Sequence, residues 1–229
     1  IIVSLEQLIL ITFGGNQNAA FYAVVARFAL ISSIITSGFV NILSREISKL
    51  KNEENLKRIN NLIKSSSELV FLISSFLAIF LGINSKELIY ILYGESYEEA
   101  SITFFIYSIY IPIQVTGSLV AIFYYALAMT RSYSLIQSIS QIIGLVIFLV
   151  SILFLMDKDN PRADIFLAMK FLFVYLFAHS YCYINCLQKN EALKSIIKML
   201  LTYILLSFGA FISKSLMQIY YLNFSNDIT

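Results

Sequence analysis

Two ionisable side chains, Glu6 and Arg27, lie deep inside apolar stretches of the sequence. Glu6 precedes the Gly14-Gly15 break by about two helical turns, and Arg27 follows Ala19, the start of the next stretch, by a similar distance. In neighbouring antiparallel membrane helices, both groups would lie roughly 10–12 Å below the outer surface of the membrane. We expect an ion pair between them or a shared water-filled cavity, because ionisable groups at such depth are usually functional. A buried pair with no transport role is the alternative.

Two lysines, Lys170 and Lys214, also interrupt apolar stretches. Lys170 lies just inside Ile165–Leu187, and Lys214 lies near the end of Ile196–Tyr220. Long lysine side chains can extend toward water from within a membrane helix. We favour this interpretation for Lys214, whereas Lys170 is equally compatible with a place in the cavity.

A proline and three amide side chains occupy the middle of the chain. Pro112 interrupts an apolar stretch and removes one backbone hydrogen bond, which kinks a helix. Gln114 follows it, and Gln137 and Gln141 lie one turn apart in the next stretch. Transporters place broken helices and polar faces around a site at the bilayer midplane. These glutamines are therefore candidates to line a cavity, with Pro112 as a hinge; polar contacts that merely join helices are the alternative.

His179, Cys182 and Cys186 share one helical face and could present three metal ligands. No fourth ligand is evident, and cysteines in such helices usually serve as small apolar packing residues. The chain also lacks the sequence motifs GxxxxGK[ST], HExxH and GxSxG, which mark nucleotide, zinc-protease and serine-hydrolase sites. We therefore expect neither a metal nor another cofactor, and we do not expect an enzyme.

The apolar stretches that carry these residues indicate the class of protein. Hydrophobic residues make up 59% of the chain and charged residues only 13%, where soluble domains carry roughly 25% charged residues. Ile102–Ala128 and Ser134–Met156 contain no charge, and each exceeds the roughly 20 residues that a membrane helix needs. They also lack the alternation of membrane β-strands. The sequence predicts an all-α, polytopic transmembrane helix bundle.

We expect about seven membrane helices, plus a short apolar segment, Leu88–Tyr93, that ends at Gly94. The first helix is too short to cross a bilayer, and the chain begins without Met, so we infer a truncated first helix and a piece of a longer chain. The expected helices are Ile1–Phe13, which ends at Gly14-Gly15-Asn16, then Ala19–Ser44, Ser67–Ile83, Ile102–Ala128, Ser134–Met156, Ile165–Leu187 and Ile196–Tyr220.

The polar breaks between these helices alternate in charge. Most of the 16 Lys and Arg residues fall in the breaks after the second, fourth and sixth helices, whereas Asp and Glu are common in the others. Because basic residues concentrate in cytoplasmic loops, we expect the chain to start in the cytoplasm and to end outside. The first basic break contains Glu46–Lys64, whose apolar residues recur at helical spacing. This pattern predicts an amphipathic helix on the membrane surface or, equally, extensions of the two neighbouring helices.

Several short motifs over residues 1–131 resemble those of one family of transporters. Phe13-Gly14-Gly15, followed by Ala20-Phe21-Tyr22-Ala23 and Arg27, resembles the start of a lobe in polysaccharide-export flippases. Leu92-Tyr93-Gly94-Glu95-Ser96-Tyr97 and Ala100 resemble their signature after the third helix of a lobe. Pro112, Phe123-Tyr124-Tyr125-Ala126-Leu127-Ala128 and Thr130-Arg131 resemble their fourth helix and its cytoplasmic turn. These are the O-antigen and polysaccharide transporters of the multidrug/oligosaccharidyl-lipid/polysaccharide exporter superfamily.

The resemblance implies that residues 1–187 form the six-helix C-terminal lobe of a MATE-like, two-lobed transporter, and that residues 188–229 add one transmembrane helix. Such a protein flips an undecaprenyl-linked oligosaccharide across a bacterial inner membrane by alternating access. Arg27 would attract the phosphate of this substrate. The implied partners are the lipid-linked oligosaccharide, membrane lipid, a missing N-terminal lobe and a coupling ion, H⁺ or Na⁺, with no nucleic acid.

Two other functions stay open at this point. A multidrug/cation antiporter of the same superfamily would use deep carboxylates, of which Glu6 is the only one in this sequence. A membrane-embedded polymerase or acyltransferase of envelope synthesis would need His, Asp or Arg clustered at one membrane face. The only histidine lies within a predicted helix, which argues against this last class.

Overall fold

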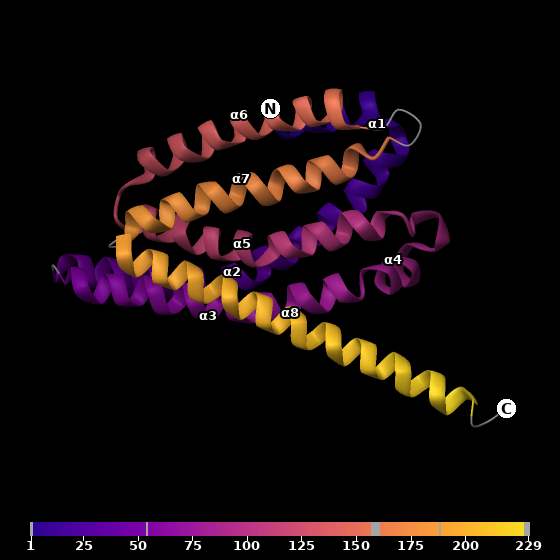
Figure 1. Ribbon diagram of the computed structural model, residues 1–229. Coiled ribbons are helices and arrows are strands. Elements are labelled where there is room, and N and C mark those ends of the chain that lie inside the picture. Colours follow the sequence, from indigo (N-terminus) through magenta and orange to yellow (C-terminus); the bar gives the residue numbers. More distant parts are fainter. Residues whose placement is uncertain (1, 54, 157–160, 188, 227–229) are drawn as a thin grey trace.

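The computed structural model describes residues 2–53, 55–156, 161–187 and 189–226, and the regular structure in those ranges is helical (Figure 1). The chain is an all-α bundle, as the apolar stretches predict. Six helical stretches are long and apolar enough to cross a membrane. The elements are α1 (Ile2–Arg27), α2 (Ala29–Asn52), α3 (Leu56–Ile83), α4 (Ser85–Tyr93), η1 (Glu95–Tyr97), α5 (Ala100–Ala126), α6 (Thr130–Leu155), α7 (Ala163–Cys186) and α8 (Lys189–Asn226).

A turn at Gly15 divides α1 into two halves. Gly15 has φ 73° and ψ 178°, a backbone conformation that is strained for residues with a Cβ. Glu6, before the turn, pairs with Lys170 of α7, and Tyr22, after it, stacks on the neighbouring Phe171 at 6.1 Å between ring centroids. The two halves therefore lie at the same depth along α7 and run in opposite directions. The predicted break between the first two helices is confirmed.

α5 lies at the centre of the bundle. It packs against α2, α3 and α7, and side chains along its whole length are buried, Phe104, Ile111 and Phe123 among them. α6 and α8 lie at the periphery, where α6 contacts chiefly α7 and α8 contacts chiefly α3 (Figure 1). The central position of α5 explains why its polar residues can meet side chains from several other helices.

The segment Glu46–Lys64 does not form a separate surface helix. Its first part belongs to α2, which continues to Asn52, and its second part belongs to α3, which begins at Leu56. Ile47 and Ile63 are fully buried in the same apolar cluster. The apolar spacing therefore comes from two helices that pack together, and the prediction that both neighbouring helices extend into this segment is correct. The helices predicted to end at Ser44 and to begin at Ser67 were too short.

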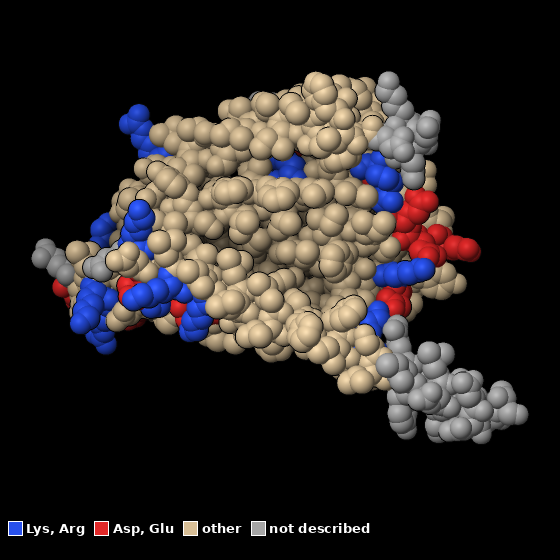
Figure 2. Space-filling view, viewed as in Figure 1, with Lys and Arg blue, Asp and Glu red and all other residues tan. Residues whose placement is uncertain are grey.

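Charged side chains gather at the two ends of the bundle (Figure 2). Lys and Arg residues cover the end where α2 joins α3 and α7 joins α8, which we call the basic end. Asp and Glu residues surround α4, η1 and the start of α7, the acidic end. Here Lys214 of α8 donates to the Glu87 carboxylate at 2.8 Å and holds the pKa of Glu87 below its usual value. Lys214 thus reaches toward the end of the bundle, as expected.

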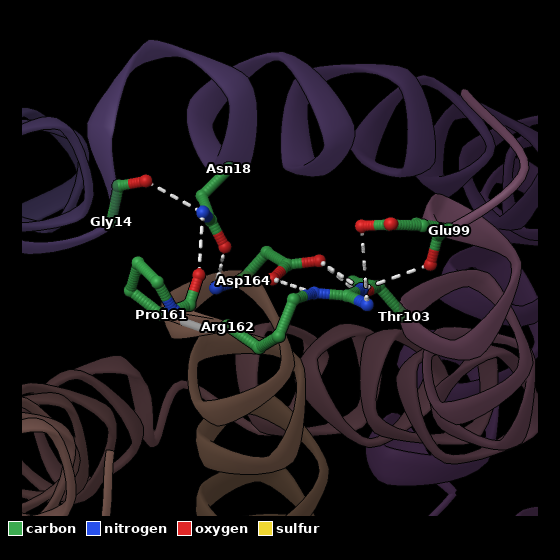
Figure 3. Close-up of polar contacts among 7 residues, drawn as sticks. All are labelled: Gly14, Asn18, Glu99, Thr103, Pro161, Arg162 and Asp164. Atoms are coloured by element: carbon green, nitrogen blue, oxygen red, sulfur yellow. Dashed lines mark hydrogen bonds and ion pairs between the residues drawn. The ribbon is translucent and has the colours of Figure 1, made fainter. Parts of the chain in front are cut away.

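A cluster of polar residues joins three elements at the acidic end (Figure 3). Arg162 donates to both carboxylate oxygens of Asp164, at 3.1 and 3.0 Å, and Asp164 is fully buried. The Asn18 amide, just after the α1 turn, donates to the Pro161 carbonyl oxygen at 2.7 Å. These bonds connect the α1 turn to the starts of α5 and α7. The cluster consists of Gly14, Asn18, Glu99, Thr103, Pro161, Arg162 and Asp164.

Candidate functional site

A buried ion pair lies between α1 and α7. The side chains of Lys170 and Glu6 are 0% and 3% exposed, and the Lys170 ammonium donates to the Glu6 carboxylate. The same ammonium donates to Gln141 Oε1 of α6 at 2.8 Å and lies 4.4 Å from the centroid of the Phe171 ring. A charge removed from water must be compensated by such partners. The pair therefore joins three helices through one cation.

The approach of α6 to this cation depends on Gly144. A Cβ added at Gly144 would lie 2.6 Å from Lys170 Cε and 2.4 Å from a methyl carbon of Val174. Real Cβ atoms do not approach neighbours so closely. Glycine at this position lets the backbone of α6 lie against the lysine side chain, which brings Gln141, about one turn away, within hydrogen-bond distance.

The partner of Glu6 is thus Lys170, and the expected ion pair with Arg27 is not formed. Arg27 is exposed, and none of the ion pairs among the described residues includes it. The second half of α1 buries Phe21 and Val25 against the bundle, which turns Arg27 outward. Glu6 lies level with Tyr22, five residues before Arg27, and the direction in which each side chain points depends on the packing of α1.

A second feature is a hollow of about 440 Å³ between α2, α5, α6 and α7, which we call the polar hollow. Its walls combine tyrosine rings and aliphatic side chains with small polar side chains and the amide of Gln114. The Oε1 atom of Gln114 is buried and has no hydrogen-bond partner among the described residues. The lining residues are Thr36, Val40, Gln114, Ser118, Ala121, Ile122, Tyr125, Tyr133, Tyr175 and His179.

Two pairs of aromatic rings line the polar hollow. Tyr125 packs against Tyr133, with 5.9 Å between ring centroids. Tyr175 packs against His179 at 5.1 Å. The His179 Nδ1 atom lies 3.5 Å from Gln137 Nε2 of α6. The rings are therefore held by their neighbours and present preformed surfaces.

The predicted polar residues divide between these two features. Gln114 lines the polar hollow, Gln137 contacts its wall at His179, and Gln141 bonds to Lys170. Tyr125, Tyr133 and Tyr175 were not predicted as site residues. Tyrosine is common in this chain, with 15 residues, and its spacing along a single helix does not show which rings meet across helices.

Pro112 lies within α5, which continues as a helix through it, and the Thr116 hydroxyl donates to the Pro112 carbonyl oxygen at 2.8 Å. Pro112 also lines a second, mainly apolar cavity of about 100 Å³ together with residues of α3, α7 and α8. His179 lines both this cavity and the polar hollow. The predicted hinge is therefore next to both hollows, about midway along α5.

His179, Cys182 and Cys186 do not form part of a metal-binding group among the residues that the structure describes. His179 instead packs against Tyr175, and Tyr124 donates a long hydrogen bond, 3.3 Å, to the Cys182 carbonyl oxygen. His179 therefore belongs to the wall of the polar hollow, and Cys182 and Cys186 pack in the apolar core of the bundle.

The described residues thus contain two polar features within the bundle: a buried ion pair and a hollow with aromatic walls beside the middle of α5. Comparison of the chain with family models, with curated proteins and with solved structures found no match.

Proposed function

We propose that this chain is one lobe of a flippase that moves a lipid-linked oligosaccharide across a bacterial inner membrane by alternating access. The observation that carries the proposal is the polar hollow. Gln114 and Ser118, in its wall, lie near the middle of α5 (Ala100–Ala126), and a bilayer that this helix spans would have its midplane near them. A helix bundle that only anchors a protein has no need of buried, unpaired polar atoms at that depth, whereas transporters place their substrate sites there.

The exposed Arg27 supports the same proposal. A guanidinium stays charged at any cellular pH, and a charge facing lipid at this depth costs several kcal/mol. Arg27 points away from the helices of this chain, so water, a second lobe or a substrate must solvate it. We propose that it faces the passage between two lobes and attracts the phosphate of the lipid-linked substrate.

The test is complementation of a strain that lacks its polysaccharide flippase. Arg27→Ala should abolish export, and Arg27→Lys should restore it only in part, because an ammonium lacks the two-pronged geometry with which arginine binds phosphate. Arg58→Ala, an exposed arginine at the basic end, is the matched control and should export normally. Full export by Arg27→Ala at normal protein abundance would remove this residue from the mechanism.

A multidrug/cation antiporter fits the site less well. That function needs a deep carboxylate that can bind a cation from the cavity. Glu6 is buried at 3% side-chain exposure and already bound to Lys170. The described residues that line the polar hollow include no carboxylate, so the hollow offers neutral hydrogen-bonding groups to a substrate where an antiporter of cations would offer negative charge.

A further inference from the structure

We propose that the polar hollow binds an uncharged sugar ring of the substrate, and that it selects against acidic sugars. This inference rests on the proposed transport function and names the substrate class more narrowly. Among the residues that the structure describes, the side chains that line the hollow include no Asp, Glu, Lys or Arg. Its polar atoms are hydroxyl, amide and imidazole groups, which pair with the hydroxyl groups of a neutral sugar.

The arrangement of these groups matches the two surfaces of a sugar ring. A pyranose has apolar C–H faces and a rim of hydroxyl groups. The rings of Tyr133 and Tyr175 offer flat apolar surfaces with polar hydroxyl groups at their ends, and Gln114 of α5 adds an amide to the same lining. The volume of about 440 Å³ is within the range of small-ligand pockets, roughly 300–1,000 Å³.

Gln114 supplies a neutral amide to the wall of the hollow. Its Oε1 atom is closed to solvent and has no hydrogen-bond partner among the described residues, so in this arrangement the oxygen does not face a ligand in the hollow. The amide can pair with sugar hydroxyl groups through its Nε2 donor, or through Oε1 after rotation of the side chain. A neutral amide does not compensate the charge of a carboxylate.

The nearby cations cannot compensate an acidic sugar. Lys170 is fully buried and bound to Glu6, so its charge is already neutralised. Arg27 is on the outward face of α1 and does not line the polar hollow. A carboxylate in the hollow would lose its hydration without gaining a counter-charge. The phosphate site that we propose at Arg27 and the sugar site are therefore separate.

The experiment measures binding of two trisaccharides to the full chain in lipid nanodiscs by saturation-transfer NMR. Maltotriose is the neutral probe, and trigalacturonic acid is the acidic probe of the same length. We expect maltotriose to bind and trigalacturonate to bind at least about tenfold more weakly. Gln114→Leu should weaken maltotriose binding by about tenfold, the size of one lost hydrogen bond, and Tyr133→Ala or Tyr175→Ala should weaken it at least as much.

Two matched controls remove the same side chains from exposed positions. Tyr181→Ala, at a tyrosine that is 57% exposed on α7, and Gln7→Leu, on the exposed side of α1, should bind maltotriose like the parent chain. Equal or tighter binding of trigalacturonate would overturn the inference, as would unchanged maltotriose binding in Gln114→Leu. Flipping of a fluorescent lipid-linked oligosaccharide, measured in proteoliposomes, tests the transport proposal separately. The proposal of a neutral-sugar site can therefore be wrong while the proposal of a flippase is right.

Discussion

Lys170 and Glu6 hold a charge pair almost completely out of water, which makes each side chain dependent on the other. Removal of one partner from a buried pair typically costs about 3–5 kcal/mol, because the other charge is left uncompensated. We expect Glu6→Gln and Lys170→Met each to lower the free energy of unfolding by about this amount, and the double variant to recover most of it. Thermal unfolding of the protein in detergent measures the effect.

The exposed pair Lys86–Glu98 is the matched control. Its atoms are 2.6 Å apart, but the two side chains are 69% and 37% exposed, so Glu98→Gln should cost at most about 1 kcal/mol. One result would support the Glu6–Arg27 ion pair that was expected from the sequence. If Arg27→Gln restored the stability of Glu6→Gln and Lys170→Met did not, the partner of Glu6 in the membrane would be Arg27.

Gly144 provides a second prediction at the scale of one residue. Gly144→Ala would place a methyl group 2.6 Å from the Lys170 side chain, and overpacking of this kind costs about 1–3 kcal/mol. At Gly209 of α8 an added Cβ meets nothing within 4 Å, so Gly209→Ala should be neutral or slightly stabilising, since alanine is the better helix former. Equal changes in the unfolding temperatures of the two variants would contradict the close approach of α6 to Lys170.

The long hairpin of α2 and α3 makes a testable claim at the scale of elements. Ile63 is fully buried, whereas Leu56, at the start of the same helix, is 70% exposed. In a packed hairpin, Ile63→Ala should cost about 2–5 kcal/mol, and Leu56→Ala should cost little. A helix lying on the membrane surface would bury both side chains in lipid, and the two variants would then lower the unfolding temperature to a similar extent.

Pro112 is the element-scale candidate for motion. It interrupts the backbone hydrogen bonds of α5 beside both hollows, and we predict that bending there accompanies the change of access. Pro112→Ala should leave abundance of the protein nearly unchanged and slow the export of surface polysaccharide in the complementation assay. Unchanged export would reduce Pro112 to a packing role in α5.

The distribution of charge over the whole molecule predicts its orientation. The basic end carries Lys51 and the acidic end carries Glu98, so we expect Lys51 in the cytoplasm and Glu98 outside. After replacement of the two native cysteines, a single cysteine at either position can be labelled in intact cells with an impermeant thiol reagent. Labelling at 98 alone is expected. Labelling at 51 alone would mean that the chain has the opposite orientation.

Much of this molecule could be predicted from the order of its residues. Uncharged stretches longer than a bilayer core become helices because only a helix satisfies its own backbone in lipid, and the glycines at 14 and 15 mark the first reversal of the chain. These properties are local, since they depend on periodicity, composition and length.

The identity of neighbours was decided only by the tertiary structure. Lys170 is 164 positions from Glu6, and several residues share its depth, so only the packing of α1 against α7 selects the partner. The same holds for Ile47 and Ile63, whose spacing suits one surface helix as well as two packed ones. The polar hollow is the clearest case: Tyr125, Tyr133 and Tyr175 come from three helices, and their convergence depends on how those helices cross, which no single stretch of sequence encodes.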